Sequence, residues 1–321
     1  MINLKDIERH LAKRIKHATV QASQGKNEDG EDIGKDSTPI VNVGQVTDLD
    51  YVQHAIYALY LIIEPIPYPL PKPGEHAYDH IQLLLKELVD DAVQRIRHLQ
   101  YFRETYNVKD TLEDAMETLQ AYFEQHPGSV ALVDVQGVSG NSSLQDEDEL
   151  NCVLAMDMNC AGWQGDFSST VNCDAHFRTY AVGYYYIYNV LNCNVAAMRR
   201  GLILIYECEG MKWSFSQQIT YVKIYRRLSE ELMEAYPLHS RKMMAYNTPG
   251  WVNFVFSLSK NFMTESYQQS VKLGCRWDDE GNSAAPRRLN DLMLTLSPED
   301  VLRRCKELYT IRMEHQRTFR L

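Results

Sequence analysis

The chain has 321 residues, of which 45% are hydrophobic, and a formal net charge of −10 at pH 7. This length allows one large core or two domains, and the acidic balance argues against a nucleic-acid partner. The opening stretch, MINLKDIERHLAKRIKHA, is amphipathic and charged, unlike a signal peptide. The longest apolar run, AIYALYLII at Ala55–Ile63, is too short to span a bilayer. We therefore expect a cytoplasmic protein.

Seven cysteines are scattered through the chain without CxxC spacing. This pattern favours neither a zinc site nor a disulfide framework, and reduced thiols are the expectation for a cytosolic protein. We expect no metal ion and no cofactor.

The N-terminal part combines short helices with polar or proline-rich segments. A polar, glycine-bearing stretch at Gly25–Pro39 predicts a flexible loop, and an apolar helix is expected around Tyr51–Ile63. The alternate prolines of EPIPYPLPKPG (Glu64–Gly74) remove backbone donors and predict an extended connector.

Two amphipathic helices follow. Apolar residues recur at helical spacing over 81–99 and again over 112–122, where Asp110 and Thr111 are candidates for the N-cap. A second polar loop is expected at Gly137–Glu149.

From residue 150 onward, strand and helix patterns alternate. The expected elements are a strand at 151–158, a helix at 177–195, a strand at 202–207, a helix at 221–232, a strand at 241–247 and a helix from Pro249. Such alternation implies crossover connections and hence an α/β fold. We predict a mainly parallel sheet flanked by helices and preceded by an α-helical N-terminal region.

Glu207 ends the predicted strand LILIYE, and Glu209 lies two residues further on, so the two glutamates bracket Cys208. Side chains two apart share a strand face, and the C-terminal ends of parallel strands often hold ligands, so an acid/base pair is one interpretation. The motifs of the common hydrolases, nucleotide-binding loops and zinc proteases are absent from the sequence. We therefore favour a structural role for both glutamates and a buried, apolar role for Cys208, and assign no catalytic residue.

Aromatic residues gather on two of the predicted helices. One stripe is formed by Tyr180, Tyr184 and Tyr188. A short helix is expected to carry Trp251, Phe254, Phe256 and Phe262. Each of these is compatible with plain core packing. Together they would suit an apolar pocket with phenol hydroxyls to orient a ligand.

Two segments, Gly201–Ile219 and Ala235–Gly274, contain motifs in a fixed order. They are the acidic turn Glu207-Cys208-Glu209-Gly210, then Tyr236-Pro237-Leu238, Asn247-Thr248-Pro249 and Phe262-Met263-Thr264-Glu265. In this order the segments resemble the CRAL-TRIO lipid-binding family, which includes the cellular retinaldehyde-binding and alpha-tocopherol transfer proteins. The match extends over about Asp174–Gly274, and the helical stretch His76–His126 is more weakly similar to the family's N-terminal region.

The resemblance implies a bowl-shaped domain that encloses one hydrophobic ligand beneath a gate helix, here about 249–262. Residues 129–295 would form this lipid-binding domain. They would follow an N-terminal extension (1–75) and a helical region (76–128), and precede a C-terminal helix (296–321). The family's closing Leu-Pro-x-x-x-Gly-Gly segment is absent.

Basic residues beside the gate hold phosphoinositide headgroups in the alpha-tocopherol transfer branch of the family. The corresponding positions here are His239, Ser266 and Ser270. Losing two or three cations at about 1 kcal/mol each would weaken such binding roughly ten- to a hundredfold. The basic residues nearby, which we take as candidate headgroup contacts, are Arg241, Lys242 and Lys272.

The favoured hypothesis is a non-enzymatic protein that binds and transfers a hydrophobic molecule or phospholipid while associating transiently with a membrane. The candidate ligand-binding residues are Tyr180, Tyr184, Tyr188, Tyr206, Tyr246, Trp251, Phe254 and Phe256. An alternative is an interaction or membrane-trafficking adaptor that keeps the fold without exchangeable cargo, with protein partners at the N-terminal extension. A hydrolase that uses Glu207 and Glu209 is the third hypothesis.

Overall fold

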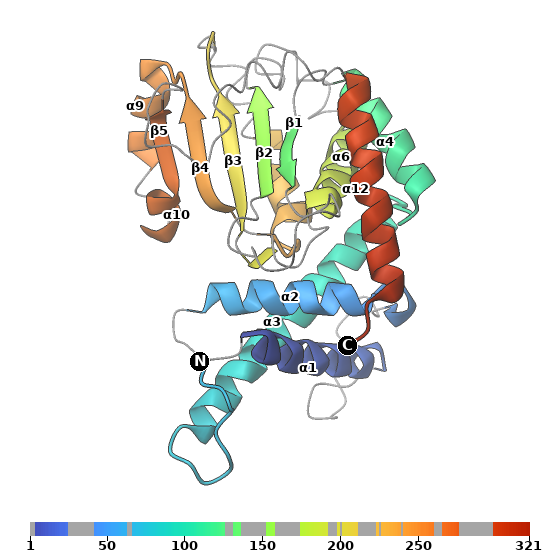
Figure 1. The fold of residues 1–321 in the computed structure, drawn as a ribbon, viewed down its shortest axis with the longest axis vertical. Helices are drawn as coiled ribbons and strands as arrows, with labels where there is room; N and C mark the ends of the chain where they lie inside the picture. Colours follow the sequence, from blue (N-terminus) through green and yellow to red (C-terminus); the bar gives the residue numbers. More distant parts are fainter. Residues whose placement is uncertain are drawn as a thin grey trace. The chain divides into compact units, whose positions relative to one another are not determined.

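The protein's structure is a computed structural model (Figure 1). It describes residues 4–24, 42–62, 66–125, 131–135, 152–157, 174–191, 198–199, 201–210, 223–224, 226–238, 240–259, 265–275 and 298–321. The chain divides into two compact units. The first combines Met1–Val108 with Glu230–Pro237 and Glu314–Leu321, and the second combines Lys109–Ser229 with Leu238–Met313.

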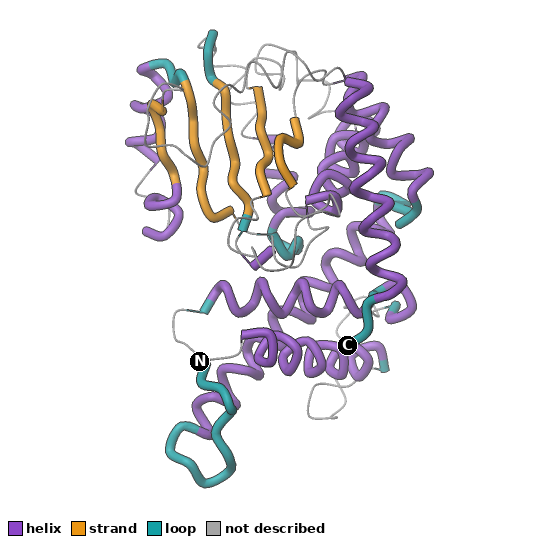
Figure 2. The backbone as a smooth tube through the Cα atoms, viewed as in Figure 1, coloured by secondary structure: helices purple, strands orange, loops and turns teal. Residues whose placement is uncertain are grey.

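The first unit is helical (Figure 2). Its main elements are α1 (Leu4–Ser23), the short 3₁₀ turn η1 (Val43–Gln45), α2 (Asp48–Leu61) and α3 (Tyr78–Thr105). α1 buries apolar residues at intervals of four, including Ile7, Leu11 and Ile15, so one face of this amphipathic helix packs into the unit. The predicted helices at 51–63 and 81–99 are confirmed as α2 and α3.

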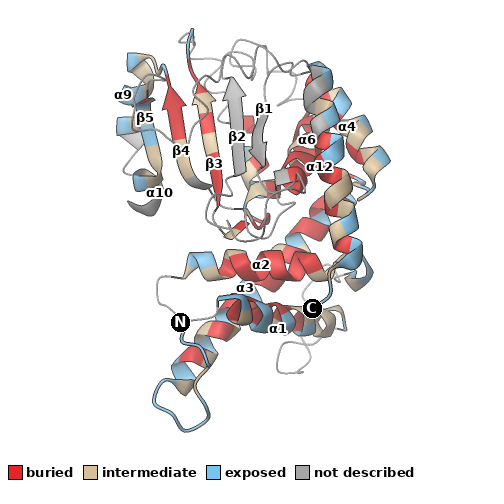
Figure 3. Cartoon of the chain, viewed as in Figure 1, coloured by how far each residue is buried: buried red, intermediate tan, exposed pale blue. Residues whose placement is uncertain are grey.

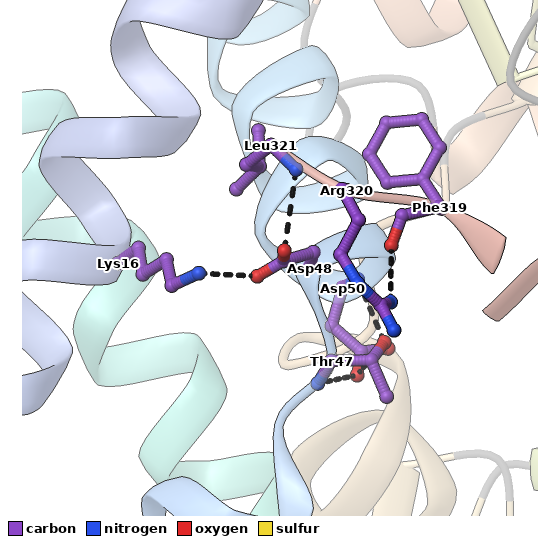
Figure 4. A network of polar contacts seen from close by, with 7 residues as sticks. All are labelled: Lys16, Thr47, Asp48, Asp50, Phe319, Arg320 and Leu321. Carbon is purple, nitrogen blue, oxygen red and sulfur yellow. Dashed lines mark hydrogen bonds and ion pairs between the residues drawn. The ribbon is translucent and has the colours of Figure 1, made fainter. Parts of the chain in front are cut away.

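The start of α2 is fixed by polar contacts that join distant parts of the chain (Figure 4). Thr47 and Asp50 form a capping box, in which each side chain accepts from the other residue's backbone N–H. Asp48 accepts from Lys16 Nζ at 2.6 Å and from the Leu321 N–H at 3.2 Å. Partial burial acts to raise the pKa of Asp48, but Lys16 and the Leu321 N–H outweigh it and lower that pKa.

α2 also buries a histidine. His54 is 2% exposed, and burial, together with Arg95 and Arg103, lowers its pKa to about 3. His54 therefore stays neutral in the folded unit at physiological pH.

The second unit contains a five-stranded sheet in the order β1-β2-β3-β4-β5. The strands are β1 (Ala131–Val135), β2 (Cys152–Asp157), β3 (Leu202–Glu207), β4 (Ser240–Tyr246) and β5 (Val271–Cys275). β1 pairs antiparallel with β2, and the other pairs are parallel. The predicted α/β fold with a mainly parallel sheet is confirmed, although the sequence did not indicate the edge strands β1 and β5.

Helices lie at both edges of this sheet, and those at the β1 edge contact one another. Figure 1 shows α4 (Leu112–Gln125), α6 (Asp174–Leu191) and α12 (Pro298–Thr318) beside the β1 edge, with α9 (Gly250–Ser259) and α10 (Glu265–Ser270) beside β5. Thr111 Oγ1 accepts from the Asp114 N–H at 3.2 Å, which confirms Thr111 as the cap of α4.

Packing between α4 and α6 depends on a glycine. A Cβ at Gly183 would lie 2.5 Å from Cδ2 and 2.8 Å from Cγ of Tyr122. Tyr122 is fully buried and makes ring contacts with Tyr180 and Tyr184, both at 6.0 Å between centroids. The absence of a side chain at Gly183 thus lets the Tyr122 ring pack directly on the α6 backbone.

Buried phenols join α6 and α12 to the start of α4. Tyr186 Oη donates to the Lys109 carbonyl at 2.6 Å and to Asp114, and Tyr309 Oη donates to Asp110. The two rings meet edge to face at 5.9 Å. Burial and the neighbouring carboxylates raise the pKa of both phenols, so both remain protonated donors.

The remaining predicted elements fall partly outside the described residues. The loops expected at Gly25–Pro39 and Gly137–Glu149 lie there, as does most of the helix expected over 221–232, of which a short π-helical turn η3 (Ser229–Met233) is seen. None of the described helices has the length and apolar character needed to cross a bilayer. Figure 3 shows that buried residues follow α2, the inner faces of α1 and α3, and β3 and β4.

Candidate functional site

The carboxyl ends of β3, β4 and β5 are joined by hydrogen bonds. Glu207 Oε1 accepts from the Glu209 N–H at 2.9 Å and from Asn247 Nδ2 at 3.0 Å. The Cys208 N–H donates to the Tyr246 carbonyl at 3.0 Å, and the Asn247 N–H donates to the Cys275 carbonyl at 3.3 Å. We call this group of contacts the strand-end latch. It ties together the acidic turn and the Asn-Thr-Pro turn that were recognised separately in the sequence.

The backbone of the latch explains two of its residue types. Asn247 has φ 50°, a left-handed conformation that asparagine tolerates better than most residues, and Gly210 ends the acidic turn with φ 77°. Glu207 is buried and engaged by amide donors, whereas Glu209 is exposed in the turn. The two carboxylates therefore do not form a pair on one face, and Glu207 instead accepts the hydrogen bonds that close the turn after β3. Cys208 is buried, as predicted.

The two faces of β3 differ in burial. Ile203, Ile205 and Glu207 are buried on one face. On the opposite face Leu202 is buried, whereas Leu204 and Tyr206, nearer the carboxyl end, are half-buried. A central strand of a parallel sheet is normally covered on both faces. The half-buried face of β3 is therefore an apolar surface that the described residues cover incompletely.

This apolar surface continues onto the neighbouring strands. Leu204 is in register with Met243 of β4, which is in register with Val271 of β5, and both of these residues are half-buried. We call Leu204, Tyr206, Met243 and Val271 the open face.

Tyr206 and Tyr246, both predicted to line a pocket, point to opposite faces of the sheet. Residues in register on parallel strands point the same way, and Tyr246 is in register with Glu207, whereas Tyr206 is in register with Ala245. Tyr246 is fully buried. Only Tyr206 belongs to the open face.

α9 begins directly after the latch and is strongly apolar. The Val252 N–H donates to the Pro249 carbonyl at 2.9 Å, which fixes the first turn of this helix. Trp251 and Phe256 are half-buried, and Phe254 is 64% exposed. The helix predicted from Pro249 is thus confirmed over Gly250–Ser259, and Phe262 lies outside the described residues.

The tyrosine stripe of α6 lies against α4. Tyr180 and Tyr188 are buried, Tyr184 is half-buried, and neighbouring rings of the stripe contact one another at 4.9 and 5.8 Å. Tyr122 contacts two of these rings, so at least that part of the stripe serves helix–helix packing.

The candidate headgroup residues lie on β4 and β5. Lys242 and Lys272 are in register with Ile203 and Met244, which places them on the sheet face opposite to Tyr206. Lys242 is half-buried and Lys272 is exposed. Arg241 lies on β4, and its side chain is outside the described set.

Sequence reasoning missed the remaining members of the open face. The strand LILIYE is apolar at five successive positions, so the pattern gives no signal for which face is open. Among the described residues, no group of three or more His, Cys, Asp or Glu side chains is placed to hold a metal ion.

Comparison with known proteins identifies a domain in this part of the chain. Residues 177–276, from α6 to β5, match the family model of the CRAL/TRIO domain, which confirms the resemblance found in the sequence. Among solved structures, the chain is similar to the crystal structure of Sfh5, with 12% identity, a TM-score of 0.44, and coverage of 85% of this chain and 82% of that one. None of the curated proteins matches the chain.

Proposed function

We propose that this protein binds a hydrophobic lipid on the open face of its sheet and transfers it between membranes without catalysis. The observation that carries the proposal is the half-buried apolar face of the central strand β3, formed by Leu204 and Tyr206. Apolar area left accessible on a central strand gains about 25 cal/mol per Å² when a ligand covers it. The match to the CRAL/TRIO domain supports lipid binding in general.

α9 is the proposed gate. It follows the strand-end latch, so its first turn is anchored, while its aromatic side chains are only partly buried. An exposed phenylalanine such as Phe254 loses its contact with water when it enters the interfacial region of a membrane. In this proposal α9 covers the ligand in solution and releases it at the membrane surface.

The state of Glu207 supports a role without catalysis. Its carboxylate accepts from two N–H donors and lies at the end of a buried strand face, which suits a latch better than proton transfer. Loss of the strand-end latch should therefore change the position of α9 and should not remove a catalytic activity.

The direct test is to identify what the protein carries. Protein purified from cells is extracted with organic solvent, and the extract is compared by mass spectrometry with that of an unrelated protein. A lipid in stoichiometric amount, or uptake of a fluorescent phospholipid or sterol analogue from liposomes, is expected. No lipid in the extract and no uptake of either analogue would refute the proposal.

Variants separate the two parts of the proposal. Tyr206→Trp adds volume to the open face and should reduce lipid uptake, whereas Phe254→Asp should slow transfer between vesicles but leave bound lipid in place. Tyr101→Trp and Tyr101→Asp are matched controls, because Tyr101 is an aromatic residue of α3 that is 57% exposed. Unchanged melting temperatures would show that the variants are folded.

An adaptor that keeps the fold without cargo is the second candidate. The observation that favours it is the packing of Tyr180 and Tyr184 on Tyr122, because large rings already fill the space between α4 and α6. The extraction experiment decides between the two, since an adaptor would yield no stoichiometric lipid.

A further inference from the structure

α1 has an exposed face that is almost entirely basic, although the whole chain carries a net charge of −10. We call this face the basic ridge, formed by Lys5, Arg9, His10, Lys13 and His17. Four of its members recur at intervals of four residues, so they follow one line along the helix for about 18 Å. Like charges at this spacing weaken a helix, so the ridge is not explained by the stability of α1.

The acidic residues of α1 are less exposed than the cations of the ridge. Glu8 is buried and Asp6 is half-buried, so neither is exposed beside the cations. No ion pair joins Arg9 or Lys13 to another residue in the described part of the chain. Partial burial and the nearby cations Arg14 and Lys13 lower the pKa of His10.

Exposed apolar side chains lie at one end of the ridge. The Lys16–Asp48 contact sets the register between α1 and α2, which run antiparallel side by side (Figures 1 and 4). Leu4 lies as far before Lys16 as Tyr60 lies after Asp48, so both reach the same end of the helix pair. Leu4, Tyr60 and the adjacent Leu61 are 48%, 46% and 46% exposed. We call these three side chains the apolar end.

We propose that the basic ridge and the apolar end together form a docking surface for an anionic membrane. Lysine and arginine side chains near such a membrane each contribute favourable binding energy, and leucine and tyrosine suit its interfacial layer. Ile7, Leu11 and Ile15 of α1 are buried inside the first unit, so the helix docks by its charged face and does not insert. The apolar end favours a lipid surface over an acidic protein, because apolar contacts accompany the charges.

Flotation of the full chain with vesicles tests this proposal. Phosphatidylcholine vesicles with phosphatidylserine should bind the protein, phosphatidylcholine alone should not, and added salt should release it. The variant Lys5→Gln/Arg9→Gln/Lys13→Gln keeps good helix formers and should bind about a hundredfold more weakly. Equal binding of this variant and the wild type would overturn the proposal, as would a wild type that binds neither vesicle.

Two further variants make the test specific. Lys109→Gln/Lys223→Gln/Lys306→Gln removes the same charge from exposed positions outside α1 and should bind like the wild type. Leu4→Ser/Leu61→Ser keeps the ridge and should weaken binding about tenfold. Capture of the wild type on immobilised polyglutamate without any vesicle binding would assign the ridge to an acidic protein and overturn the membrane proposal. Because flotation does not measure lipid uptake, its failure is distinguishable from failure of the proposed ligand binding.

Discussion

Substitution of Gly183 by alanine tests whether α4 and α6 are held together by direct contact of a ring with a helix backbone. The added Cβ would lie 2.5, 2.8 and 3.0 Å from Cδ2, Cγ and Cβ of Tyr122. The last two atoms sit close to the α4 backbone, and Tyr180 and Tyr184 lie against the same ring, so it has little room to retreat. The helices must therefore shift apart.

Two opposing effects set the size of this change. Overpacking in a well-packed core costs about 1–3 kcal/mol, whereas replacing glycine by alanine within a helix gains about 1 kcal/mol. Because Tyr122 is only 1% exposed, we place the overpacking term in the upper half of its range. Gly183→Ala should then destabilise the protein by about 1–2 kcal/mol.

The assay is urea unfolding followed by near-UV circular dichroism, which reports on the packing of aromatic side chains. Gly250→Ala is the matched control, because a Cβ at Gly250 would meet no atom within 4 Å. That variant should be neutral or more stable by up to about 1 kcal/mol. In the background Tyr122→Ala, Gly183→Ala should no longer destabilise. The same loss with and without the Tyr122 ring would refute this reasoning.

Three further predictions concern the latch and two titrating groups. Asn247→Ala removes the amide donor to Glu207 at a left-handed position and should lower the free energy of unfolding in urea by about 2 kcal/mol. An unchanged unfolding midpoint would show that the strand-end latch does not stabilise the fold. In Tyr186→Phe, the loss of stability as pH rises past about 10 should be shallower than in the wild type, because burial and Asp114 raise the pKa of this phenol only in the folded state. For His54→Leu, stability should fall less between pH 6.5 and 3, since the folded-state pKa of about 3 requires a proton to bind preferentially to the unfolded chain. Equal pH profiles of the variant and the wild type would contradict either of the last two predictions.

Elements with strong local signals could be predicted from the sequence. β3 has the bounds expected for it, Leu202–Glu207, because a continuous apolar run is flanked by Gly201 and Gly210, which both adopt positive φ. The start of α4 was likewise visible in Thr111, whose hydroxyl accepts from a first-turn N–H.

The edge strands could not be predicted in the same way. β1 and β5 have only five residues each, and the five-residue run VKLGC of β5 includes a lysine and a glycine. Such strands form because a neighbouring strand offers hydrogen-bonding groups, which is tertiary information. The pairing of Tyr186 with Asp114 is also tertiary, since it joins two helices far apart in the chain.

Two sequence motifs of the candidate site correspond to a contact in the structure. Glu207 and Asn247 are 40 residues apart, yet a hydrogen bond joins them, so the acidic turn and the Asn-Thr-Pro turn meet in the structure. The aromatic residues carry no such mutual constraint. Tyr206 and Tyr246 are the same residue type near the ends of adjacent strands, but the register places one on the open face and the other in the interior. Strand register therefore decides which aromatic residues face the open side of the sheet, because a one-residue shift would move every side chain of the strand to the opposite face. The strand-end latch, in turn, fixes where α9 begins.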